Sequence, residues 1–392
     1  MRKYEKVKEY LVNIDFDMID DSDLLDNVYR EIETYEETLL LDMDVVSNFE
    51  LLIKKSNISQ ILTLCKKLNF PKIAIKKTGS KFLEIIFIQI INLNCNKKEL
   101  KKLKNVVINP INDNFKNIIC NKNGTHVIRK YFELLKNKEI FQCYKTEILK
   151  ILNEEIEVDI LVTIICYLKL SYSRTISRKI IEVYFSSDNC KNKIFSYVFE
   201  DLINISDKKT IQKMFLILKN CYSELINNNI ASFVVIAFIK KYLEQTDFFY
   251  ENITNFQNMN VILGILENYV KLKNYKKVNE IFKNFYGVED DVFKFFLLSR
   301  TDTPDTKFIN LICLLMDVDK YDVNKDFCEY FEKEWIHKKY GLCLMKAFLE
   351  GQASKKLKIE FAKKFNFSRS LSTKKDGKKI MSLIKSYRKL IK

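Results

Sequence analysis

Glycine and proline are scarce in this chain, and their scarcity restricts its fold more than any other feature of the sequence. Only 7 glycines and 3 prolines occur among 392 residues. Sheet-rich folds and nucleotide-binding α/β folds depend on these two residues in their many tight turns. The composition therefore predicts helices that are joined by short polar turns.

Apolar residues recur with a helical period through most of the chain. In residues 82–93, for example, a wide apolar face is interrupted by Glu84 and Gln89. Similar segments follow at residues 126–135, 160–170, 176–185, 211–218, 230–243, 261–272, 278–286, 308–316 and 342–349. Many short helices without a proline-rich or serine-rich linker between them are typical of a solenoid of helix pairs. The longest apolar run, residues 230–239, is too short to span a bilayer, which takes about 20 residues.

A short motif recurs along the chain. Its copies with glycine are GSKFLE at residues 79–84, GTHVIR at 124–129 and, more weakly, GLCLMK at 341–346. Copies without glycine begin at residues 46, 173, 208, 232, 275 and 306. The nine copies are spaced by about 37 residues on average, which suits one helical hairpin per repeat. The copies at 208 and 232 are closer together than the others, so one of those two is suspect.

The motif predicts three side chains on one face of a helix. Its first, second and fifth positions share that face, while the third and fourth turn away. In residues 125–129 this predicts that Thr125, His126 and Arg129 point outward together. Stacked hairpins would then form a concave wall on which RNA bases lie between second-position side chains. The first-position and fifth-position side chains would contact the edges of these bases.

The predicted RNA-binding residues occupy these positions in four copies of the motif. They are Ser80, Lys81, Glu84, Thr125, His126, Arg129, Ser173, Arg174, Ser177, Thr306, Lys307 and Asn310. Other interpretations stay open for several of them. Ser80 and Glu84 could cap or bridge a neighbouring helix, and Lys81 and Arg129 could be ordinary solvated charges. Phe233, in the copy at 232, fits the core better than a stacking platform.

The motif and its order resemble the Pumilio repeat. Among Pumilio-like proteins, the chain most resembles the nucleolar protein nine family, whose members are nucleolar and act in the processing of small-subunit pre-ribosomal RNA. The resembling stretches are DNVYREI at 26–32, VSNFELL at 46–52, GSKFLE at 79–84, GTHVIRKYFELL at 124–135 and ASFVV at 231–235. The resemblance covers roughly residues 1–350 and is strongest up to about 135. It implies an all-α, curved α-solenoid of Pumilio-like helical hairpin repeats that binds precursor ribosomal RNA in the nucleolus or nucleus and is not an enzyme.

Base selectivity is expected to be limited. In sequence-specific Pumilio proteins the first and fifth motif positions form a base code, and here only Ser80 with Glu84 fits a recognised pair, the guanine type. The combinations Val46/Glu50, Ser232/Ile236 and Leu342/Lys346 do not fit the code. We therefore expect phosphate contacts and RNA shape to supply much of the affinity.

The net charge of +15 is unevenly distributed. Residues 1–50 hold 5 Lys and Arg against 15 Asp and Glu, whereas residues 351–392 hold 14 against 2. A basic middle and tail favour a polyanionic partner, because each neutralised phosphate releases counterions; a lysine-rich soluble surface is the alternative. We expect an acidic helical cap at 1–45, an array of about 9–11 repeats at 46–350 and a basic helical tail at 351–392.

Two lysine runs carry a weaker signal. The first run comprises Lys97, Lys98, Lys101, Lys102 and Lys104, and the second comprises Lys374, Lys375, Lys378 and Lys379. The first run is typical of a solvated helix face, and contact with the RNA backbone is its second interpretation. The second run fits a phosphate clamp or a nuclear import signal.

The sequence offers no recognisable catalytic or metal site. Its ten cysteines occur singly and its only histidines are His126 and His337, whereas structural zinc needs four clustered ligands. Phosphate-binding loops and nucleophile elbows are missing as well, so we expect neither a cofactor nor enzymatic activity. Single cysteines in apolar stretches indicate reduced core residues, and the start lacks the apolar stretch of a signal peptide, which favours an intracellular protein.

The expected function is that of an RNA-binding ribosome biogenesis factor. It would act as a monomer on small-subunit precursor RNA, together with other pre-ribosome assembly factors. One alternative is a protein-interaction solenoid of the HEAT or armadillo kind, whose repeats of about 40–47 residues lack this motif. Another is a related nucleolar Pumilio-like factor of the large-subunit pathway.

Overall fold

The computed structural model describes residues 2–16, 22–93, 95–135, 144–253, 259–286, 306–318, 322–331, 339–364 and 375–390. Within these ranges all regular secondary structure is helical. Among the described helices, none is long and apolar enough to cross a lipid bilayer. The fold class expected from the sequence, an all-α solenoid of helical hairpins, is therefore confirmed.

The chain divides into two compact units. The first unit comprises residues 1–189 and 193–216, and the second comprises 190–192 and 217–392. The helix α17 (Lys208–Ile226) contributes to both. The division into an acidic cap, a repeat array and a basic tail stays a prediction.

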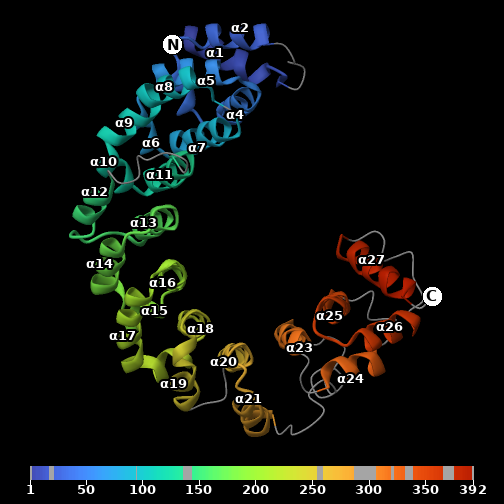
Figure 1. The fold of residues 1–392 in the computed structure, drawn as a ribbon. Coiled ribbons are helices and arrows are strands. Elements are labelled where there is room, and N and C mark those ends of the chain that lie inside the picture. The colour runs from blue at the N-terminus through green and yellow to red at the C-terminus, as the bar shows by residue number, and fades with distance from the viewer. Residues whose placement is uncertain are drawn as a thin grey trace. The chain divides into compact units, whose positions relative to one another are not determined.

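The first unit contains two layers of helices (Figure 1). In the first layer, each helix packs on the next in the order α4 (Val46–Lys55), α7 (Lys77–Asn92), α11 (Lys122–Leu135), α13 (Val158–Leu170) and α16 (Lys193–Ile205). The second layer comprises α5 (Ile58–Lys67), α6 (Phe70–Ala74), α8 (Lys97–Leu103), the π-helix η2 (Lys104–Ile108), α9 (Asn109–Asp113), α10 (Phe115–Ile119), α12 (Tyr144–Ile151) and α14 (Arg174–Tyr184). The remaining helices are α1 (Arg2–Asn13), α2 (Ser22–Glu31), α3 (Glu36–Leu40) and α15 (Ser187–Cys190).

The second unit repeats this arrangement. Its first layer runs through α18 (Ala231–Lys241), α20 (Met259–Lys271), α23 (Thr306–Val318), α25 (Lys339–Glu350) and α27 (Lys375–Lys389), each packed on the next. Its second layer comprises α19 (Thr246–Glu251), α21 (Tyr275–Ile281), α24 (Val323–Tyr330) and α26 (Lys355–Lys364), and two short helices, η4 (Leu243–Gln245) and η5 (Phe282–Tyr286), follow α18 and α21.

Burial of one apolar face explains why these segments are helical. In α7, Phe82, Leu83 and Phe87 are completely buried, and the ring of Phe82 meets that of Phe49 in α4 with centroids 5.6 Å apart. Full burial of such a side chain contributes about 1.5–3 kcal/mol. The faces that each helix buries therefore hold successive hairpins together.

Asparagine residues define where several helices begin. The side chain of Asn57 accepts a hydrogen bond from the Gln60 backbone N–H at 3.0 Å, and the Gln60 side chain accepts one from the Asn57 N–H at 2.9 Å. Asn96 and Glu99 form the same reciprocal arrangement at the start of α8. These capping boxes satisfy backbone donors that the first turn leaves unpaired. The chain can therefore start helices after very short polar turns.

The glycines of the two clearest motif copies have a packing role. A Cβ atom added at Gly79 would lie inside van der Waals distance of the Ile73 carbonyl oxygen, and one added at Gly124 would do the same to Ile118. Both isoleucines lie six residues upstream, in the short helices α6 and α10. The motif glycine therefore lets the preceding short helix approach the first-layer helix closely.

The cysteines of the described residues are free thiols. Cys65 is buried, and desolvation raises its pKa to about 12, as expected for a reduced core residue. The expectation that all single cysteines lie in the core is wrong for Cys120 and Cys343, which are exposed. Cys120 follows the last residue of α10, and Cys343 lies at a surface position of α25.

Candidate nucleic-acid interface

Six first-layer helices in the described parts of the chain share one five-residue burial pattern. Along the chain, the residues are buried, exposed, buried, buried and partly exposed. In the first unit the pattern occupies Ser80–Glu84, Thr125–Arg129 and Ser196–Glu200, and in the second unit it occupies Ser232–Ile236, Ile309–Cys313 and Leu342–Lys346. The recurring unit of this solenoid is therefore a pattern of packing that includes one regularly exposed side chain.

The first position of the pattern is buried, so the predicted outward triplet is wrong at this position. Ser80 is 4% exposed and Thr125 is 0% exposed. Their hydroxyls donate to the backbone oxygens of Lys77 at 3.0 Å and Lys122 at 2.7 Å. A small hydroxyl side chain can donate its hydrogen bond to a backbone oxygen in the preceding turn of its own helix. This local bond keeps both side chains inside the packed face.

The second position is exposed in each of these helices. In the first unit it is occupied by Lys81, His126 and Tyr197, and Tyr197 is 56% exposed. An exposed lysine is the first residue of each of the same helices: Lys77 in α7, Lys122 in α11 and Lys193 in α16. Residues four apart lie on the same face of a helix. Each of the three helices therefore presents a cation beside a long or flat side chain.

The fifth position has different roles in different helices. In α11, the Arg129 Nε donates to the Thr163 hydroxyl at 3.0 Å, and its Nη2 donates to the Asp159 backbone oxygen at 3.2 Å. The Arg129 guanidinium also lies 3.7 Å from the Asp159 carboxylate. Arg129 therefore joins α11 to α13. In α7 and α16 the fifth position is a partly exposed glutamate, Glu84 or Glu200.

The copy in α16 is not among the copies predicted from the sequence. Residues Ser196-Tyr197-Val198-Phe199-Glu200 have serine first and glutamate fifth, as in the copy that begins at Ser80. The Ser196 hydroxyl donates to the Lys193 backbone oxygen at 2.9 Å, as the Ser80 hydroxyl does to Lys77. The signal that could have found it was this pair of residue types, because no glycine precedes Ser196.

Three predicted site residues lie in the other layer. Ser173, Arg174 and Ser177 belong to the start of α14, which packs beside α12 in the second layer. The Arg174 guanidinium pairs with Asp207, and Ser177 is completely buried with its hydroxyl on the Ser173 backbone oxygen at 3.0 Å. The prediction that these residues share a wall with Lys81 is wrong, because second-layer helices bury an apolar face with the same period. The copies at 208 and 275 also fall in the second layer, in α17 and α21.

The copy predicted at residue 306 has the wrong register. The side chains of Thr306 and Lys307 lie outside the described residues. In α23 the burial pattern begins at Ile309, which places Asn310 at the exposed second position and not at the fifth. Phe233 in α18 also occupies a second position and is 49% exposed, so its interpretation as a core residue is wrong.

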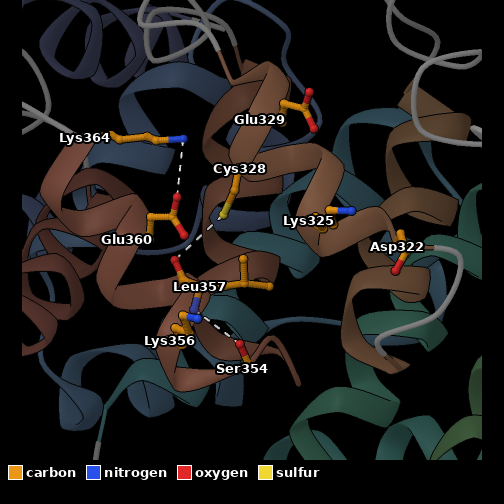
Figure 2. A pocket seen from close by; sticks show the side chains of 9 residues that line it. All are labelled: Asp322, Lys325, Cys328, Glu329, Ser354, Lys356, Leu357, Glu360 and Lys364. Atoms are coloured by element: carbon orange, nitrogen blue, oxygen red, sulfur yellow. Dashed lines mark hydrogen bonds and ion pairs between the residues drawn. The ribbon is translucent and has the colours of Figure 1, made fainter.

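A separate cavity of about 550 Å³ lies between α24 and α26 of the second unit (Figure 2). Its lining balances three lysines against three carboxylates and consists of Asp322, Lys325, Cys328, Glu329, Ser354, Lys356, Leu357, Glu360 and Lys364. The Cys328 thiol donates to the Leu357 backbone oxygen at 3.8 Å, and burial raises its pKa to about 12. A thiol that stays protonated is a poor nucleophile. Nor does any group of His, Cys, Asp and Glu in the described residues have the arrangement of a metal site.

The stacked helical hairpins in two layers define a helical-repeat fold of the Pumilio kind. Three solved structures of APUM23 are similar to the chain. The structure with the insert region deleted and the sequence GGAAUUGACGG is 16% identical, with a TM-score of 0.69, and the match covers 98% of this chain and 89% of that one. The structure with GGAUUUGACGG is 14% identical, with a TM-score of 0.69 and coverage of 99% and 90%. The structure with GGAAUUGACGG is 15% identical, with a TM-score of 0.67 and coverage of 98% and 90%.

The similarity lies in the fold and much less in the sequence. No protein-family model and no curated protein sequence matches the chain. The matched structures cover nearly the whole chain, so the Pumilio-like architecture expected from the motif is confirmed.

Proposed function

We propose that the chain binds single-stranded RNA along α7, α11 and α16 of the first unit. The observation that carries this proposal is the exposed pair on each helix, formed by a lysine and the second-position residue one turn later. The pairs are Lys77 with Lys81, Lys122 with His126, and Lys193 with Tyr197. Lysines neutralise backbone phosphates, and the rings of His126 and Tyr197 offer faces on which bases stack.

Base selectivity would come from the two glutamates at fifth positions. A carboxylate only accepts hydrogen bonds, and the Watson–Crick edge of guanine presents two adjacent N–H groups. Glu84 and Glu200 therefore favour guanine at two places along the strand. Arg129, at the intervening fifth position, is held by α13 and would read no base. Such an interface has limited selectivity, in agreement with the expectation from the sequence.

The RNA that we propose is the precursor of small-subunit ribosomal RNA, and the proposed location is the nucleolus or nucleus. This part rests on the resemblance of the motif to the nucleolar Pumilio-like family. The APUM23 structures that share the fold include RNA sequences, which supports RNA as the class of partner. We propose a binding role for a monomer that works with other assembly factors and performs no catalytic step.

The test is the affinity of the full chain for a single-stranded fragment of this precursor RNA at several salt concentrations. The variant Lys77→Glu/Lys81→Glu/Lys122→Glu should bind on the order of 100-fold more weakly at low salt, with a salt dependence shallower by about 2 in logarithmic slope. A matched control is Lys145→Glu/Lys209→Glu/Lys276→Glu, which reverses three exposed lysines of the second-layer helices. Equal affinities of the two variants would contradict the proposal, and a pulldown of protein partners that survives nuclease treatment would favour the protein-binding alternative.

A further inference from the structure

A second basic surface lies on α8, in the second layer of the first unit. Within eight residues, five lysines are all exposed, and they comprise Lys97, Lys98, Lys101, Lys102 and Lys104. By helical geometry they share one side of the helix, while Leu103 is buried on the other side, which packs toward α5, and Leu100 is exposed beside it. The lysines therefore form one continuous patch, here called the α8 lysine cluster.

This cluster differs from several basic residues of the second layer. Five of those side chains pair with a carboxylate one repeat away, in the pairs Lys67–Glu33, Lys72–Glu37, Lys116–Glu154, Arg174–Asp207 and Lys213–Glu182. The five lysines of the α8 cluster form no ion pair with any residue that the structure describes. Repeat-to-repeat pairing of charges therefore recurs on this layer, whereas the α8 cluster gathers five lysines without such a pair.

The single carboxylate on α8 is already engaged. The Glu99 side chain accepts a hydrogen bond from the Asn96 backbone N–H at 2.8 Å, which completes the capping box of the helix. Five like charges remain within about two turns, where they repel one another and gain nothing from intramolecular pairing. A polyanion would remove this repulsion and release counterions at the same time.

The composition of the cluster indicates which polyanion fits. Protein interfaces are anchored by buried aromatic or arginine side chains, and membrane-surface helices insert apolar residues. The cluster contains neither aromatic rings nor arginine, and its cations are the compact charges of lysine. Lysines without neighbouring aromatic rings contact phosphates and do not stack on bases. Such contacts suit a double helix, in which the phosphates are exposed and the bases are paired.

We propose that the α8 lysine cluster is a second RNA-binding surface, which holds the phosphate backbone of a double-helical RNA segment. The inference rests on the proposed function and deepens it, because it makes the target a single strand that adjoins a duplex. The first layer would hold the single strand, and α8 would hold the adjoining helix. Structured precursor RNA has this composition of strands and helices.

The test compares three RNAs on the full chain: a single strand, a blunt duplex, and the same single strand joined to that duplex. The variant Lys98→Glu/Lys101→Glu/Lys102→Glu should bind the joined RNA about 10- to 100-fold more weakly and bind the single strand with unchanged affinity. The control Lys145→Glu/Lys209→Glu/Lys276→Glu should leave both affinities unchanged. Because all of these lysines are exposed, circular dichroism should show identical folding.

Three outcomes would overturn the inference. The first is an unchanged affinity of the α8 variant for the joined RNA, and the second is an equal loss with the single strand. The third is a dependence on the cluster that appears only with vesicles containing phosphatidylserine, or only in capture of an acidic protein. The variant Lys77→Glu/Lys81→Glu/Lys122→Glu separates the two proposals, since it should weaken single-strand binding and spare the blunt duplex. Loss of duplex binding in the α8 variant without any first-layer effect would uphold this surface and refute the proposed function.

Discussion

The first layers of the two units share a burial pattern but differ in what they expose. In the first unit, the exposed second positions are Lys81, His126 and Tyr197, each one turn after a lysine. In the second unit they are Phe233, Asn310 and Cys343. The buried positions are alike because both units must stack hairpins, which requires apolar residues at the third and fourth positions and a small hydroxyl or apolar residue at the first. The packing pattern therefore defines the scaffold, and under the proposed function the exposed residues determine RNA binding.

The comparison predicts its largest effect when the exposed positions are truncated. The variant Lys81→Ala/His126→Ala/Tyr197→Ala should lose on the order of 100-fold in affinity for single-stranded RNA, because phosphate contacts and base stacking of about 1–3 kcal/mol each are removed. Asn310→Ala/Cys343→Ala, at equivalent positions of the second unit, should change the affinity by less than about twofold. Fluorescence anisotropy measures both. A larger loss in the second-unit variant would reverse the assignment of the interface.

The packing role of the motif glycine gives the next largest effect. Gly124→Ala should lower the free energy of unfolding by about 1–3 kcal/mol, because the added methyl group collides with the backbone of Ile118. Gly264→Ala is the milder comparison, since its Cβ would lie 3.3 Å from the Ile239 Cγ2 and would meet no backbone atom within 4 Å, so it should destabilise less than Gly124→Ala. Urea denaturation followed by circular dichroism measures both. Equal stabilities would show that the close approach of α10 can relax without cost.

The glutamate of α16 should determine a preference for guanine. Glu200→Gln should reduce the discrimination between guanine and adenine at one position of the RNA by about 10-fold, which falls within the 1–3 kcal/mol of a bidentate contact to a base edge. Glu133→Gln is the control, because Glu133 is an exposed residue of α11 that pairs with Lys130. Competition binding with singly substituted RNAs gives the ratio. An unaltered preference would remove Glu200 from the interface.

Arg129 should affect stability and leave RNA affinity unchanged. Arg129→Ala removes the hydrogen bonds to Thr163 and Asp159, so the free energy of unfolding should fall by about 1 kcal/mol. RNA binding should stay within about twofold of the original value, since the guanidinium is occupied by α13. Denaturation and anisotropy on the same variant separate the two effects. A loss of RNA affinity without a loss of stability would show that Arg129 contacts RNA, as predicted from the sequence.

The fold could be predicted from the sequence because its causes are local. Few glycines and prolines, helical periodicity and short asparagine-capped turns all act within a hairpin, and they leave little choice except a helical solenoid. The motif copies in α7 and α11 were found because a glycine precedes both, and that glycine has a packing role. These parts of the prediction succeeded because one physical requirement fixed several residues together.

The assignment of copies to a layer could not be predicted in the same way. Helices of both layers bury one apolar face, so the segment beginning at Ser173 looks like a first-layer copy although α14 lies in the second layer. The hydroxyl of Thr125 shows a second limit, because a polar residue that bonds its own helix is compatible with complete burial. Only the packing of neighbouring helices distinguishes these cases. The RNA-binding roles of Lys81, Glu84 and His126 stay predictions.

Photocrosslinking of the full chain to single-stranded RNA, followed by mass spectrometry of the attached peptides, identifies the helices that contact RNA. Crosslinks are expected on peptides that contain Lys81, His126 and Tyr197, from three helices of the first layer in the first unit. Crosslinks confined to α18, α23 and α25, or to second-layer helices other than α8, would contradict the proposed function.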